Sequence, residues 1–162
     1  MISLFILFPG CTKDENPPFY KVDVVEQFRA YDFGSFLGTR KVEFSKDNLG
    51  GVLFKIQPGY LVGGTIQASH RGVGIAVFES QQAALSAVEA RRKNIANRIL
   101  KGSVKQSGIT DWWFCEDQAL LSIVHRNIVF EVAILDEHYS ETGQLLWDTA
   151  RGFLNTVEPG EQ

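Results

Sequence analysis

The fold of this chain is decided by residues 108–135, which read GITDWWFCEDQALLSIVHRNIVFEVAIL. β-branched and aromatic residues dominate the stretch, and this composition predicts three consecutive strands, at 111–116, 118–124 and 128–135. A tight turn near Arg126-Asn127 would join the last two strands into an antiparallel hairpin. The hairpin would pair residue 124 with 129, 122 with 131 and 120 with 133.

The two faces of this hairpin differ in polarity. Opposed residues in an antiparallel pair point to the same face, and successive residues along each strand alternate between faces. One face carries Ser122 and Glu131 among apolar residues, so we expect it to meet solvent, a helix edge or a partner. The other face is predicted to be core and carries Ala119, Leu121, Ile123, His125, Ile128, Phe130, Val132 and Ile134.

The rest of the chain predicts further strands and two main helices. Alternating residues favour strands at 40–45, 52–56, 62–69 and 73–78, and Pro58-Gly59 fits the centre of a type II turn. Residues 20–31 fit a helix or a strand. Good helix formers predict a long helix from about residue 80 to 100. A second helix is predicted after residue 140, with Leu146, Ala150, Phe153 and Val157 in register on its inner face. This order predicts an α+β fold: a single meandering antiparallel sheet with both helices packed on one face. The element order resembles that of the PsbP-like α/β sandwich domains found among bacterial lipoproteins.

The charge of the chain restricts its partners. A net charge of −3 over 162 residues disfavours a nucleic-acid partner. The cations nevertheless cluster within residues 91–105, a stretch that contains no acid. We expect a solvated helix face there, and the alternative is a basic patch for an anionic partner or a lipid headgroup. The cluster consists of Arg91, Arg92, Lys93, Arg98, Lys101 and Lys105.

The N-terminal residues indicate where in the cell the protein is located. Residues 1–10, MISLFILFPG, are almost wholly apolar but too short to span a bilayer, and the polar run TKDENPP follows Cys11. This pattern resembles a bacterial lipoprotein signal peptide, which is cleaved before a lipid-bearing cysteine. The resemblance implies a signal at 1–10, an acylated (palmitate-bearing) Cys11, a tether at 11–18 and a globular domain at 19–162. The protein would then sit at the cell envelope, anchored in the membrane on the periplasmic side. The alternative is a cytoplasmic protein whose N-terminus is a buried strand.

Motifs for chemistry are lacking in the sequence. The chain has no GxSxG, P-loop or HExxH pattern, and its two cysteines lack metal-site spacing, so no cofactor or metal is predicted. Cys115 lies in an aromatic strand and is expected to be buried and inert. His138 is expected at a solvated helix start. The alternative to a binding protein is a small hydrolase-like enzyme whose site combines dispersed residues, such as His70, His125 and Glu131.

The adjacent pair Trp112-Trp113 is the most informative binding signal. Neighbours on a strand point to opposite faces, so we expect one tryptophan, with Trp113 favoured, to be partly exposed at a groove or dimer surface. We therefore predict a lipid-anchored extracytoplasmic binding or assembly module without catalytic activity. Its partner would be a protein, a small ligand or a second copy of the chain. The candidate binding residues are Trp113, Trp112, Arg91, Arg92 and His125.

Overall fold

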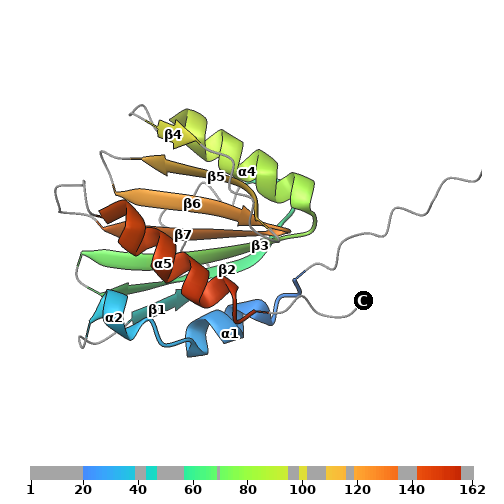
Figure 1. The fold of residues 1–162 in the computed structure, drawn as a ribbon. Helices are drawn as coiled ribbons and strands as arrows, with labels where there is room; N and C mark the ends of the chain where they lie inside the picture. The colour runs from blue at the N-terminus through green and yellow to red at the C-terminus, as the bar shows by residue number, and fades with distance from the viewer. Residues whose placement is uncertain are drawn as a thin grey trace, which may run out of the picture.

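A computed structural model describes the chain over residues 20–38, 43–46, 57–68, 70–94, 99–101, 109–115, 119–134 and 142–157. Figure 1 shows a twisted sheet with helices packed against it. The helices are α1 (Val24–Ala30), α2 (Gly34–Leu37), α4 (Gln81–Asn94) and α5 (Thr142–Leu154). The strands are β1 (Glu43–Lys46), β2 (Tyr60–Ala68), β3 (Arg71–Phe78), β4 (Ile99–Lys101), β5 (Ile109–Cys115), β6 (Leu120–His125) and β7 (Ile128–Ile134).

The strands that the structure describes form one antiparallel sheet of seven, in the order β1-β2-β3-β7-β6-β5-β4. The hairpin β6–β7 lies near its centre with the predicted register, which pairs Ser122 with Glu131 and Val124 with Val129. Arg126 and Asn127 form the two-residue turn, and Arg126 takes the positive φ of 56° that such turns require. The α+β class and the hairpin are therefore confirmed.

Helices cover both faces of the sheet, so the prediction that both main helices share one face is wrong. In Figure 1 α5 crosses in front of the strands, and α4 lies on the opposite side. The reason is the mixed face of the hairpin, where Val124 and Val129 continue an apolar surface onto Phe78 of β3. That surface is too apolar to remain in water, and α4 covers it with Ala84, Ala87 and Val88.

The core on the α5 side is aromatic. Phe130 of β7 stacks on Phe153 of α5 at a centroid distance of 5.1 Å, and Phe28 of α1 and Phe33 lie against both rings. Every apolar residue predicted for this face of the hairpin is buried. The predicted inner face of α5 is confirmed, because Leu146, Ala150 and Phe153 are buried, and Val157, which follows the end of the helix, is buried too.

Two local structures were decided by the fold. Residues 20–31, which the pattern left open, contain the helix α1. The long helix predicted to reach residue 100 is too long, because α4 ends at Asn94 and Ile99–Lys101 pair with β5 as a strand. The open edge of β5 offers backbone partners there, and such pairing overrides local helix propensity. The strand predicted at 52–56 lies outside the described residues.

The turn before β2 matches its prediction. Gly59 has a φ of 81°, and the amide of Tyr60 donates to the carbonyl of Gln57 over 3.2 Å. A Cβ at Gly59 would lie 2.7 Å from that of Ala83, so glycine is required here for space as well as for φ. The backbone of Gly59 therefore lies close to Ala83 in the first turn of α4.

Candidate functional site

The tryptophan pair has the reverse of the predicted exposure. Trp113 is 0% exposed, and it lies in the core beneath α4. Trp112 points to the α5 side and is only partly buried. The prediction that Trp113 is the exposed residue is therefore wrong, because it assumed that the face bearing Trp113 has no helix over it.

A partly exposed row of side chains runs between β5 and α5. Trp112 meets Trp147 edge-to-face at a centroid distance of 5.1 Å, and the Arg151 guanidinium lies 5.3 Å from the centre of the Trp147 ring. Phe114 and Leu145 are partly buried against the same core. We call this surface the aromatic ridge, and it consists of Trp112, Phe114, Leu145, Trp147 and Arg151.

The ridge joins one predicted residue to residues that the sequence analysis did not single out. Trp147 and Arg151 are four residues apart on α5, a spacing that places two side chains side by side on a helix. They flank the buried positions Leu146 and Ala150. A sequence signal for Trp147 and Arg151 therefore existed, but the contact with Trp112 arises only when α5 packs across β6 and β7.

A row of polar side chains lies buried on the opposite face, under α4. Trp113, Ser122 and Glu131 are consecutive cross-strand neighbours on β5, β6 and β7. Arg91 of α4 reaches the row, and its Nε lies 2.8 Å from Oε1 of Glu131, with only 11% and 8% of the two side chains exposed. The Trp113 indole N–H has no hydrogen-bond acceptor among the described residues.

The Arg91–Glu131 pair connects α4 to the sheet. Burial raises the pKa of Glu131, and the charge of the neighbouring Arg91 guanidinium lowers it in part. Arg91 was a candidate for binding an external partner, but its side chain points inward to a carboxylate of its own chain. Such a contact holds the helix in one position.

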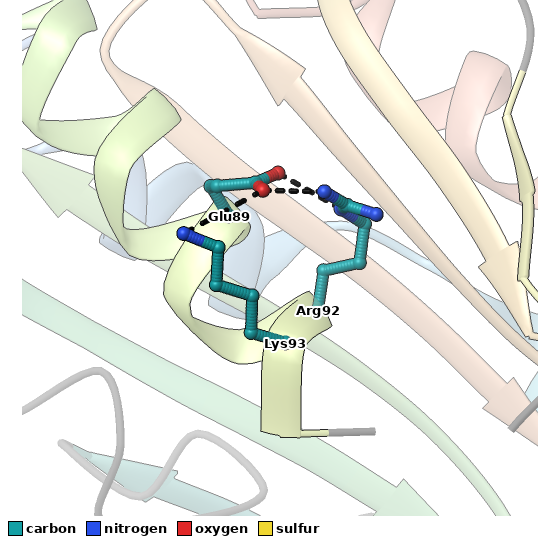
Figure 2. Close-up of polar contacts among 3 residues, drawn as sticks. All are labelled: Glu89, Arg92 and Lys93. Carbon is teal, nitrogen blue, oxygen red and sulfur yellow. Dashed lines mark hydrogen bonds and ion pairs between the residues drawn. The ribbon is translucent and has the colours of Figure 1, made fainter. Parts of the chain in front are cut away.

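Arg92 and Lys93 project from the outer side of α4 and share one acid (Figure 2). Arg92 Nε donates to Oε2 of Glu89 over 2.8 Å, and this carboxylate raises the pKa of the guanidinium. Lys93 Nζ lies 4.0 Å from Glu89 Oε1, and its side chain is 71% exposed. Within α4, Arg92 and Lys93 therefore share the single negative charge of Glu89, whereas Arg91 pairs with Glu131 of β7. The side chains of Arg98, Lys101 and Lys105 lie outside the described part of the chain.

His125 belongs to a hydrogen-bonded cluster at the turn end of the hairpin. Its Nδ1 lies 2.9 Å from the Tyr20 hydroxyl oxygen. The Tyr20 hydroxyl donates to the carbonyl of Val157 over 3.4 Å. Asn127 accepts from the backbone N–H of Tyr20 over 2.7 Å and donates to the carbonyls of Tyr20 and Phe78, each over 2.8 Å. We call Tyr20, His125 and Asn127 the Tyr20 clamp. Burial raises the pKa of the Tyr20 phenol, and the charge of Arg126 partly lowers it.

The residues named for an enzymatic site do not converge. His125 is buried on the α5 side of the sheet, whereas Glu131 lies on the α4 side. His70 is exposed at the β2–β3 turn, at the end of β3 opposite to the clamp. Cys115 is buried, as predicted. Cys11 and His138 lie outside the described residues.

Three further observations concern ligands, membranes and relatives. No group of three or more His, Cys, Asp and Glu residues within the described ranges could hold a metal ion. Among the described helices, none is long and apolar enough to cross a membrane. A comparison with known protein families, curated proteins and solved structures finds no match to this chain.

Proposed function

We propose that this protein is a lipid-anchored extracytoplasmic binding or assembly module without catalytic activity, and that it contacts its partner through the aromatic ridge. The observation that carries the proposal is the partly exposed pair Trp112–Trp147 with Arg151 beside it. Tryptophan and arginine are the residue types most enriched among binding hot spots. The other candidate residues face inward or pair within the chain, so the ridge is the best supported contact surface.

The two tryptophans of the ridge are held in place by the core beneath them, and this favours binding. Trp112 lies on β5 and Trp147 on α5, and both pack against the aromatic core around Phe130. Side chains held in this way lose little conformational freedom when a partner binds, so less of the binding energy is spent on ordering them.

The charge of Arg151 favours a partner that carries acceptor oxygens, such as the carboxylate or carbonyl groups of another protein. The indole N–H of Trp112 and the Nε–H of Arg151 are buried without an acceptor among the described residues, so these two groups do not face a partner.

The anchor is tested by Cys11→Ser. Acylation of Cys11 would hold the protein in the membrane fraction, because a lipid chain adds apolar surface that partitions into the bilayer. The variant should therefore move to the soluble fraction, as measured by fractionation and by mass spectrometry of the N-terminus. Unchanged fractionation together with an intact Met1 would contradict the anchor.

The binding surface is tested by photo-crosslinking in cells. A photoreactive residue at Trp147 should capture a specific partner or a second copy, whereas the same residue at Gln82, exposed on the opposite helix α4, should not. Sedimentation of the purified protein then separates self-association from binding to another protein. Trp112→Ala should weaken the captured contact by about 2 kcal/mol or more, roughly 30-fold in Kd, if it is a hot spot. Equal crosslinking at both positions would contradict the assignment of the ridge.

A further inference from the structure

We infer that the turn end of the hairpin, which carries the Tyr20 clamp, faces the lipid bilayer and touches it through Val22 and Leu61. This inference rests on the proposed lipid anchor at Cys11. It adds an orientation, because it says which end of the sheet meets the membrane and which side chains make the contact.

The chain that leads from Cys11 is fastened at this end. Both backbone groups of Tyr20 are bonded to the Asn127 side chain in the β6–β7 turn, at 2.7 and 2.8 Å. Tyr20 lies nine residues after Cys11. A chain of that length spans at most about 32 Å when fully extended and roughly 15–18 Å when it behaves as a flexible coil. An acylated Cys11 would therefore keep the turn end of the sheet close to the bilayer surface.

The large apolar side chains that are exposed in the described residues gather at the same end. Val22 is 55% exposed and Leu61 is 51% exposed. Val22 follows the clamp residue Tyr20 and precedes α1. Leu61 is the extra residue of a bulge at the start of β2, beside Phe78, whose carbonyl accepts a hydrogen bond from Asn127. On the right-hand side of Figure 1, this end includes the start of α1 and the end of α5.

Among the described residues, the charges around Val22 and Leu61 nearly balance. Lys21 and Arg126 are the cations that the described part of the chain places at this end, and the Arg126 guanidinium lies 6.0 Å from the centre of the Tyr20 ring. Asp23 and Glu79 are exposed acids at the same end. An apolar contact with the headgroup region therefore dominates over electrostatic attraction. The contact should form on zwitterionic phosphatidylcholine as well as on anionic lipid, and it should change little with salt.

The orientation is measured by fluorescence quenching. The lipid-modified mature chain carries a fluorophore and is bound to phosphatidylcholine vesicles, and these vesicles contain a spin-labelled lipid that quenches a nearby fluorophore. Lys21→Cys places the probe beside Val22 and leaves both apolar residues intact. Ser35→Cys is the matched control, since Ser35 is exposed on α2 at the opposite end, where the neighbouring Phe36 carbonyl accepts from Arg71. Cys115 is buried, and labelling of the parent chain measures its background.

Quenching at position 21 should be several-fold stronger than at position 35. Adding Val22→Ser and Leu61→Ser to Lys21→Cys should reduce the quenching while the protein still floats with the vesicles. Equal quenching at both positions, stronger quenching at 35 or none at either on floating protein would overturn the orientation and leave the anchor standing. A chain that retains Met1 and stays off the vesicles would overturn the anchor and the orientation together.

Discussion

Removal of Arg91 tests how α4 is held on the sheet. Arg91→Met keeps much of the aliphatic length of the side chain but leaves the Glu131 carboxylate, which is only 8% exposed, without its cation. Breaking a buried ion pair by removing one partner costs about 3–5 kcal/mol, because the remaining charge is desolvated and uncompensated. A loss of 3 kcal/mol would lower the melting temperature by roughly 10 °C in a domain of this size.

Arg92→Met is the matched control for this experiment. Arg92 is the next residue on the same helix, and its ion pair with Glu89 is 28% and 38% exposed. A pair that is exposed to solvent in this way adds little to stability, because water and salt screen the attraction. Urea unfolding followed by far-UV circular dichroism at pH 8 measures both variants. Equal stability of the two variants would refute the structural role of the buried pair.

The pH dependence of Arg91→Met provides a second readout. The pKa of Glu131 is raised by burial above the ordinary value of 4.5, so the folded chain binds more protons than the unfolded chain between the two pKa values. The contribution of Glu131 to stability is therefore present below about pH 4.5 and is lost as the pH rises through the folded pKa. Loss of Arg91 raises that pKa further, so the deficit of the variant should be largest at pH 8 and shrink toward pH 5. A deficit independent of pH would mean that lost packing, and not the charge of Glu131, destabilises the variant.

Two further predictions concern the core and the clamp. Trp113→Ala should destabilise the fold by about 3–5 kcal/mol, because it removes a large side chain that is fully buried. Trp112→Ala should destabilise it clearly less, because Trp112 is partly exposed. Urea unfolding compares the two variants, and equal losses of stability would contradict the difference in burial. Asn127→Ala removes three side-chain hydrogen bonds and should lower the free energy of unfolding by about 2–3 kcal/mol. Hydrogen exchange at the Tyr20 amide should become faster, and unchanged exchange would show that the clamp does not hold Tyr20.

The function of the surfaces could be predicted only in part from the sequence. The Trp112-Trp113 pair indicated correctly that the two side chains take opposite faces, because alternation is a property of the strand itself. Which of them is exposed depends on the position of α4, and no local pattern specifies that position. Arg91 and Arg92 are neighbours in sequence, yet one pairs with a buried carboxylate and the other with Glu89 in its own helix.

The hairpin of residues 120–134, its register and its apolar face could be predicted from the local sequence, because a period of two and a tight turn are set by local chemistry. The local sequence also predicted the inner face of α5, where Leu146, Ala150 and Phe153 follow the helical period. Three features follow only from long-range packing: α4 covers the second face, residues 99–101 add a strand, and Trp147 contacts Trp112. These features depend on contacts between segments far apart in the chain, and burial of a whole surface outweighs the weak preference of any single segment.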